Sequence, residues 1–281
     1  MANTATKSRA QSLINYWPKV ALLAIVSVLA FGCGLRSHPV KGGRKEITIR
    51  VAAASDLKFA LDELILAFAK DNPGVVVEPS YGSSGNFYSQ LSNQAPFDLF
   101  LSADRDYPRK LIDAGLADAT SEFIYGVGRI VVWTTKARNL DVQTLGIAAL
   151  QAPGVQKIAI ANPAHAPYGR AAEAALKSLG VYDSVNDRLV LGENISQTAQ
   201  FVESGAADIG VIALSLALAP KMESAGQYWV VPEDAYPKME QVGVILTRTT
   251  ERSSTEALRA FIISTPGREI LKRYGFQVPE E

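Results

Sequence analysis

The chain of 281 residues carries 28 Lys and Arg residues and 28 Asp and Glu residues, so its formal net charge is zero. This balance, without a dense basic run, argues against a nucleic-acid binder, which usually presents a basic face. Two histidines and one cysteine are too few for a transition-metal cluster or an internal disulfide. The length suffices for one large domain or two smaller ones, each with a core.

The first 32 residues have the pattern of a bacterial export signal. Lys7, Arg9 and Lys19 precede an apolar run over residues 20–31, and Gly32 follows it. A basic segment, a short apolar run and a small residue before the cut are typical of such signals. The run is shorter than the ~20 residues of a comfortable membrane span. Residues 33–45 contain Ser, Pro and Gly, and we interpret them as a flexible tether.

The single cysteine, Cys33, directly follows this signal. The segment Ala30-Phe-Gly-Cys33 resembles a lipobox, in which signal peptidase cuts before the cysteine and a lipid is attached to it. This interpretation predicts a lipid anchor that tethers the folded part of the chain to a membrane. The alternative is a plain secretory signal, with Cys33 removed or left as a free thiol.

From residue 46 the pattern alternates between strands and helices, which predicts an α/β fold with largely parallel sheets. In the first half we expect strands at 47–51, 75–79 and 98–102, and helices at 56–70, after 85, and at 107–114. The first of these helices has Leu57, Ala60, Leu61, Leu64, Ile65 and Phe68 on one face.

Two glycines near residues 125–128 precede an apolar strand at 130–133, and we interpret them as a crossing into a second lobe. There we expect strands at 157–161, 189–191, 207–213 and 227–232, and helices at 170–179 and 198–203. The chain is expected to return near 236–241, followed by a strand at 242–247 and helices at 256–263 and 266–273. Lobe 1 is therefore predicted to comprise 46–127 plus 240–281, and lobe 2 to comprise 128–239.

Four loops of this pattern share one design. Each follows a strand, opens a helix and is rich in small or hydroxyl residues: 52–55, 82–85, 167–169 and 194–196. In open α/β sheets, ligands bind beyond the carboxyl ends of strands, where helix N-termini converge. Two loops belong to each lobe, so closing the lobes would direct four sets of N–H groups at one point. The sequence therefore predicts a site for a small anion that needs no Lys or Arg.

Several residues have a structural interpretation beside a functional one. Ser55 at a helix start is, taken alone, an ordinary N-cap. We expect His165 to be a loop residue with local hydrogen bonds. Asp98 and Asp104 suggest turn and cap roles rather than acid–base catalysis, because each flanks a strand. We expect Arg170 to be a solvated helix residue, since a buried guanidinium needs a partner.

Six motifs, in order, resemble the molybdate-binding proteins of bacterial molybdate ABC importers. They are Ala52-Ala-Ala-Ser55, Tyr81-Gly-Ser-Ser-Gly85, Phe97-Asp-Leu-Phe-Leu-Ser-Ala-Asp104, Asn162-Pro-Ala-His-Ala-Pro-Tyr-Gly169, Gly192-Glu-Asn-Ile-Ser196 and Arg273-Tyr-Gly-Phe276. The resemblance implies a type II periplasmic-binding-protein fold, with two lobes, each a mostly parallel sheet flanked by helices, and the ligand in the cleft.

The same resemblance implies a solute-binding protein, not an enzyme, that needs no cofactor. It would capture molybdate or tungstate in the periplasm or at the outer face of the cytoplasmic membrane. The protein would act as a monomer and would deliver the anion to an ABC permease and ATPase. Another oxyanion, such as sulfate or phosphate, is the alternative ligand.

By motif position, the resemblance places the hydroxyls and amides of Ser55 and Ser84 on the anion, with the backbone N–H groups of Tyr168 and Ile195. Molybdenum would be held by these four residues as the bound oxyanion, in tetrahedral geometry. One position departs from the pattern: some family members supply a tyrosine hydroxyl where this chain has Ala213. Three candidates could replace the missing tyrosine ligand: the backbone N–H of Asp56, the residue Ser83 and the residue Asn86.

Overall fold

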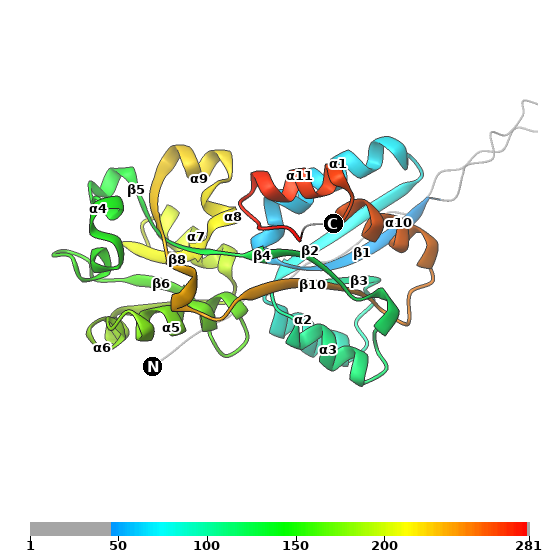
Figure 1. Ribbon diagram of the computed structural model, residues 1–281, viewed down its shortest axis with the longest axis horizontal. Coiled ribbons are helices and arrows are strands. Elements are labelled where there is room, and N and C mark those ends of the chain that lie inside the picture. Colours follow the sequence, from blue (N-terminus) through cyan, green and yellow to red (C-terminus); the bar gives the residue numbers. More distant parts are fainter. Residues whose placement is uncertain (1–45, 280–281) are drawn as a thin grey trace, which may run out of the picture. The chain divides into compact units, whose positions relative to one another are not determined.

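The computed structural model of the chain describes residues 46–279, which belong to one compact unit (Figure 1). The predicted signal over 1–32, the tether over 33–45 and the lipidation candidate Cys33 lie outside the described residues. Within residues 46–279, no helix combines the length and the apolar character needed to cross a membrane.

The first of two five-stranded sheets has the strand order β2-β1-β3-β10-β4. Its strands are β1 (Ile47–Ala54), β2 (Val75–Gly82), β3 (Leu99–Ser102), β4 (Phe123–Gly128) and β10 (Met239–Ile245). β1 runs parallel to β2 and β3, whereas β10 is antiparallel to its neighbours β3 and β4. Four strands thus share one direction, and the return strand β10 opposes them.

Side chains alternate between the two faces of this sheet, as the two-residue period of a strand requires. Val51 and Ala53 of β1 belong to the hydrophobic cluster that includes Leu61, whereas Ala52 between them joins the cluster of Phe87. The first face is covered by α1 (Lys58–Asp71), α10 (Arg252–Ile262) and α11 (Thr265–Arg273), and the second by α2 (Ser84–Ser92) and α3 (Asp106–Asp113) (Figure 1). Because both faces are buried, the short strands are almost continuously apolar.

The second sheet has the order β7-β6-β8-β5-β9, and β5 is antiparallel to its neighbours β8 and β9. Its strands are β5 (Ile130–Thr135), β6 (Ile158–Ala161), β7 (Leu189–Gly192), β8 (Ile209–Ala213) and β9 (Gly226–Val230). Around it lie α4 (Val142–Leu145), α5 (Pro167–Ser178), α6 (Tyr182–Val185), α7 (Ile195–Glu203), α8 (Leu214–Ala217) and α9 (Pro220–Ala225). The prediction of mostly parallel sheets is therefore correct for both.

The chain passes from the first sheet to the second at Arg129, between β4 and β5, and returns between β9 and β10. The glycine-containing segment 125–128, interpreted from sequence as a crossing into a second lobe, forms the second half of β4 and ends one residue before Arg129. Glycine suits position 126 of this strand, because an added Cβ would lie only 3.2 Å from the Cβ of Phe276. The exact division of the chain into lobes at 127/128 and 239/240 stays a prediction.

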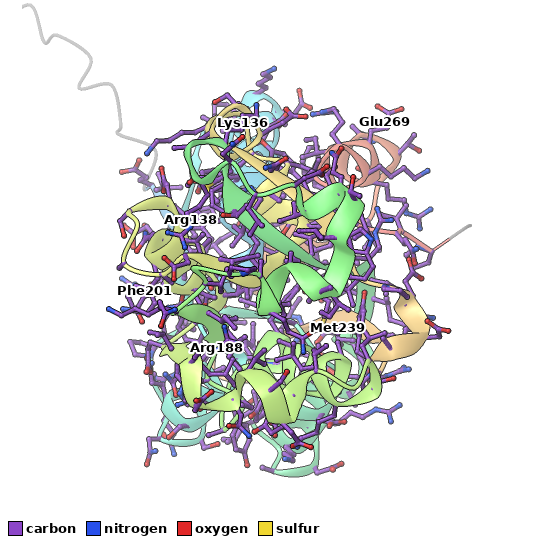
Figure 2. The ribbon with its side chains drawn as sticks, turned by 90° about the vertical axis from the view of Figure 1, so that its left-hand side faces the viewer. Lys136, Arg138, Arg188, Phe201, Met239 and Glu269 are labelled. Carbon is purple, nitrogen blue, oxygen red and sulfur yellow. The ribbon has the colours of Figure 1, made fainter. Side chains whose placement is uncertain are left out.

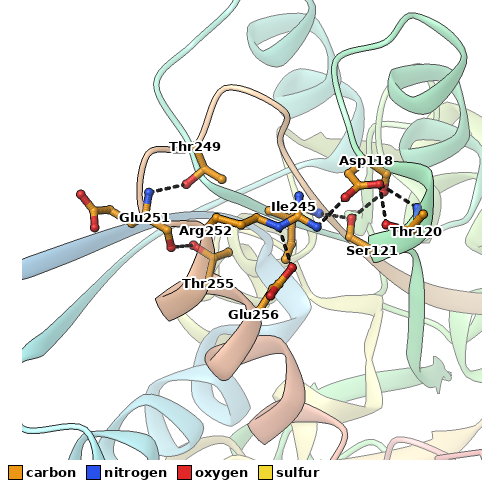
Figure 3. Close-up of polar contacts among 9 residues, drawn as sticks. All are labelled: Asp118, Thr120, Ser121, Ile245, Thr249, Glu251, Arg252, Thr255 and Glu256. Carbon is orange, nitrogen blue, oxygen red and sulfur yellow. Dashed lines mark hydrogen bonds and ion pairs between the residues drawn. The ribbon is translucent and has the colours of Figure 1, made fainter.

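Hydrogen bonds from polar side chains hold a helix and a loop against the two sheets. Arg252, at the start of α10, donates to the carboxylates of Asp118 and Glu256, and Ser121 accepts the Ile245 N–H of β10 (Figure 3). These bonds tie α10 to the short 3-10 turn Ala119–Ser121 and so to the first sheet. In the second sheet, Arg138 and Arg188 (Figure 2) donate to the carbonyls of Gly154 and Val155 and hold the loop before β6.

Candidate functional site

The four predicted loops meet at one small cavity between the carboxyl ends of the two sheets. Its lining comprises Ala54, Ser55, Asp56, Gly82, Ser83, Ser84, Ala103, Ala166, Pro167, Tyr168 and Ile195. All four residues predicted to bind the ligand, Ser55, Ser84, Tyr168 and Ile195, are in this set, although 140 positions separate the first from the last. No Lys or Arg lines the cavity among the described residues.

Ser55 does not act as the ordinary N-cap that a serine at a helix start suggests. It begins a 3-10 turn, Ser55–Leu57, and α1 follows without a side-chain cap. Its hydroxyl donates to Asn194 Oδ1 at 3.1 Å and accepts the Ser196 N–H at 3.2 Å. Both partners belong to the start of α7, so the Ser55 side chain joins the two sheets at the cavity.

Ser83 and Ser84, at the start of α2, divide two tasks between them. Ser83 is the N-cap residue, and its hydroxyl accepts the Asn86 N–H at 3.4 Å. Ser84 is the first helical residue, is 1% exposed, and accepts the Ala103 N–H at 2.9 Å through its hydroxyl. Because a neighbour does the capping, the Ser84 hydroxyl hydrogen and the Ser84 backbone N–H are left for other acceptors.

Tyr168 and Ile195 lie in the first turns of α5 and α7, where backbone N–H groups have no acceptor within the helix. The sequence placed both helix starts three residues too late, at 170 and 198. Pro167 is compatible with the first helical position, where its missing N–H and fixed φ do no harm. Asn194 caps α7 by accepting the Gln197 N–H at 3.0 Å. The earlier starts make these two N–H groups helix N-terminal donors with positive dipole ends.

Direct contacts close the two sheets over the cavity. The Gly85 N–H donates to the His165 carbonyl at 2.9 Å, and the His165 ring Nδ1 lies 3.0 Å from the Ser83 hydroxyl. His165 has the local hydrogen bond predicted for a loop residue, from its N–H to the Asn162 carbonyl at 3.3 Å, and it also contacts the first sheet through its carbonyl and its ring. Arg170 is exposed as predicted, but it also forms an ion pair with Asp104 at 2.6 Å across the same cleft.

Asp56 is the one acidic side chain in the cavity lining, and the sequence interpretation considered only its backbone. The carboxyl is 1% exposed, and Oδ2 accepts the Tyr168 hydroxyl at 3.0 Å. Gln241 Nε2 in turn donates to the Tyr168 oxygen at 3.2 Å. Burial raises the pKa of Asp56 to about 7, and nearby donors, Tyr168 first, only partly oppose this. The sequence does contain a sign that Asp56 is unusual, because it is the one charged residue in the otherwise mostly apolar stretch 51–57.

Ala213, where some family members carry a tyrosine, is a fully buried residue at the end of β8 and is not in the cavity lining. Of the three compensating candidates, Asp56 and Ser83 line the cavity. Asn86 instead donates to the Glu193 carboxylate across the cleft.

Acid–base catalysis finds no support in the carboxylates singled out from sequence. Asp98 accepts the Arg50 N–H at 2.7 Å and the Thr249 hydroxyl at 2.6 Å, which fixes a strand edge. Asp104 accepts the Tyr107 N–H at 3.2 Å at the start of α3. Both have the turn and cap roles predicted for them. Among residues 46–279, no group of His, Cys, Asp and Glu is arranged to hold a metal ion.

Comparisons with known proteins give a family match and several relatives. The family described as "Bacterial extracellular solute-binding protein" matches residues 49–277. The chain is 36% identical over 249 residues to the molybdate-binding protein ModA of Azotobacter vinelandii, covering 89% of this chain and 96% of that protein. It is 28% identical over 253 residues to the putative ABC transporter substrate-binding lipoprotein YvgL of Bacillus subtilis (strain 168), covering 89% and 93%.

Among solved structures, the periplasmic molybdate-binding protein of Azotobacter vinelandii matches with a TM-score of 0.77 and 32% identity. The match covers 83% of this chain and 100% of that chain. It confirms the predicted two-lobed α/β fold with a sheet in each lobe.

Proposed function

Because the chain belongs to the bacterial extracellular solute-binding protein family, we propose that it captures molybdate as the binding component of an ABC importer. The resemblance found in the six sequence motifs is confirmed by the relatives. A member of this family is a binding protein rather than an enzyme. The observation that carries the ligand assignment is the cavity in which Ser55, Ser84, Tyr168 and Ile195 meet.

These residues suit a small oxyanion because they offer hydrogen-bond donors without a full positive charge. Ser84 supplies its hydroxyl hydrogen, and Ser55 would exchange Asn194 Oδ1 for an anion oxygen as the acceptor of its own. The first turns of α2, α5 and α7 supply N–H groups at positive dipole ends. The donors would contact the oxygens of the anion, so molybdenum would have no direct protein ligand. Tungstate, with the same tetrahedral shape, is expected to bind the same set.

Size is the expected basis of selection against sulfate and phosphate. Donors held at fixed positions by helix starts make good hydrogen bonds to an anion of one radius and longer, poorer bonds to a smaller one. The two sheets contribute donors from both sides, so the ligand would stabilise the closed arrangement over an open one.

The partners and the location follow from the same proposal. The protein would act outside the cytoplasmic membrane, as a monomer, and deliver the anion to an ABC permease and ATPase. We propose that the export signal ends at residue 32 and that Cys33 carries a lipid. The lipoprotein name of the Bacillus subtilis relative supports this proposal. Mass spectrometry of the mature N-terminus tests it, since an unmodified N-terminus cut elsewhere would refute the anchor.

Isothermal titration of the protein with molybdate, tungstate and sulfate tests the main proposal. We expect binding of molybdate and tungstate and much weaker binding of sulfate at matched ionic strength. Comparable affinity for sulfate, or for phosphate in a parallel titration, would assign the cavity to another oxyanion. Absence of any binding would reject the site.

A further inference from the structure

The Asp56 carboxyl has a structural feature that its packing does not explain. Oδ2 is bonded to the Tyr168 hydroxyl, but Oδ1 is buried and has no hydrogen-bond partner among the described residues. Buried polar atoms in folded proteins almost always have a partner, and leaving one without costs about 1–3 kcal/mol. Since Asp56 also lines the candidate cavity, the missing partner of Oδ1 points to a ligand.

The protonation state of Asp56 decides what kind of partner Oδ1 can take. An ionised carboxylate only accepts hydrogen bonds and would repel a bound dianion. A tetrahedral molybdate dianion has acceptor oxygens only, so it cannot donate to that carboxylate. A neutral carboxyl, in contrast, has one O–H donor that an anion oxygen can accept. The ligand and the carboxyl are compatible only when the carboxyl is protonated.

The surroundings of Asp56 favour that neutral form. The titratable groups that face it are the hydroxyls of Tyr168 from α5 and Tyr125 from β4, and burial holds the pKa of each well above its usual value. Gln241 from β10 is neutral, and Ser215 from α8 donates to the Asp56 backbone carbonyl at 2.8 Å. Among residues 46–279, no cationic side chain lines the cavity to stabilise a carboxylate.

We propose that the protonated carboxyl of Asp56 is a further ligand of the bound oxyanion, donating its O–H from Oδ1 to an anion oxygen. This inference rests on the proposed oxyanion-binding function. It makes capture of the anion dependent on a bound proton. At a pH where the free protein has lost that proton, binding must take one up from solution.

This proton linkage gives the inference a measurable sign. With the pKa of the free carboxyl at about 7, molybdate affinity stays constant below that pH and falls about tenfold per unit above it. Between pH 6 and pH 8.5 the loss is roughly thirtyfold. Titrations at pH 8.5 in two buffers of different ionisation enthalpy should report about one proton taken up per anion.

The substitution Asp56→Asn keeps the shape and a donor but removes the titrating group. We expect D56N to bind molybdate with an affinity that no longer changes between pH 6 and 8.5, and without proton uptake. The matched control is His165→Gln, because His165 is an ionisable residue that contacts Ser83 beside the cavity. H165Q should keep the pH dependence of the unmodified protein. The reverse pattern, with D56N still pH-dependent and H165Q not, would assign the proton to the histidine and overturn the inference.

The two levels of the proposal fail differently. No binding of molybdate at pH 6 rejects the oxyanion function itself. Binding with equal affinity at both pH values and no proton uptake retains that function and rejects the role of Asp56. Where D56N does not fold or does not bind, carbon-13 NMR of the aspartate-labelled wild type decides. A buried carboxyl that titrates near neutral pH in the free protein and stays protonated with molybdate is expected, and its absence contradicts the proposal.

Discussion

The hydroxyl of Ser55 accepts a hydrogen bond from the backbone N–H of Ser196 at 3.2 Å, and the Ser196 hydroxyl donates back to the Ser55 carbonyl at 2.8 Å. The first residue follows β1 of the first sheet and the second lies in α7 beside the second sheet. This reciprocal pair holds the two halves of the cavity together. A residue proposed to bind the ligand therefore also takes part in closure.

Replacing Ser55 with alanine removes a hydroxyl that serves both tasks. We expect S55A to lose about 1–3 kcal/mol of molybdate binding free energy, which is roughly a five- to 150-fold weaker affinity. Isothermal titration measures this, and Ser89→Ala on the exposed side of α2 is the matched control. If S55A bound molybdate with the same affinity as the S89A control, Ser55 would not be a ligand of the anion.

Gly85 allows the backbones of the two sheets to approach each other. A Cβ at this position would lie 2.6 Å from the His165 carbonyl oxygen and 2.6 Å from the Tyr107 hydroxyl. Gly85→Ala should change folding stability little, because the Tyr107 hydroxyl is the end of a side chain that can move aside and alanine is the better helix former in α2. Closure should be hindered, and we expect an affinity loss on the order of tenfold from the smaller closed population.

Calorimetric titration combined with urea unfolding separates the two effects in G85A. If affinity and stability fell together, a general packing defect would explain the result and not a closure defect. Small-angle scattering with and without molybdate gives an independent readout. It should show that G85A remains more open in the presence of the anion.

Gly226, the first residue of β9, packs directly on Trp133 of β5. An added Cβ would lie 2.1 Å from two ring atoms of Trp133, whose side chain is fully buried. We expect Gly226→Ala to lower the free energy of unfolding by about 1–3 kcal/mol or more through overpacking. The double variant with Trp133→Phe should be less destabilised than the sum of the two single variants. Strict additivity in denaturant unfolding would show that the ring is not the cause.

Asp118 should contribute stability that disappears in acid. Hydrogen bonds from Thr120 and then the Arg252 guanidinium lower its pKa to about 2 (Figure 3). Since the folded pKa is below the unfolded value of about 3.9, the contribution is complete above pH 4 and is lost as the pH falls through 2. The carboxyl is partly exposed, so solvent screening limits the effect to about 1 kcal/mol or less.

The substitution Asp118→Asn tests this contribution. Its unfolding free energy should be lower than that of the wild type at pH 7 and equal to it near pH 2. Asp113→Asn, at an exposed position at the end of α3, is the comparison and should show a smaller difference at pH 7. A D118N protein with the same deficit at both pH values would mean that shape, rather than charge, is what the asparagine disturbs.

Much of the fold could be predicted because its signals are local. The three- and four-residue spacing of apolar residues in 57–68 predicted the buried face of α1, and Leu57, Leu61, Leu64 and Phe68 are all at most 2% exposed. The strand segments were recognisable because both faces of each sheet are covered, which makes them almost continuously apolar. The strand formed by segment 125–128 could not be predicted locally, because it depends on pairing with β10, more than 100 positions away.

The sequence by itself determined the α/β class and the four loops that follow strands, and its resemblance to the family singled out Ser55, Ser84, Tyr168 and Ile195 within those loops as candidates for one anion site. Helix and strand periods and the chemistry of helix starts are local properties, so one sequence suffices to recognise them. Only the tertiary structure decided that these loops share a cavity, that Ser55 and His165 bond across the cleft, and that Asp56 is buried with one oxygen unpartnered. These features depend on distances between residues far apart in the chain, and burial, which sets hydrogen-bond demand and charge, exists only once the chain has folded.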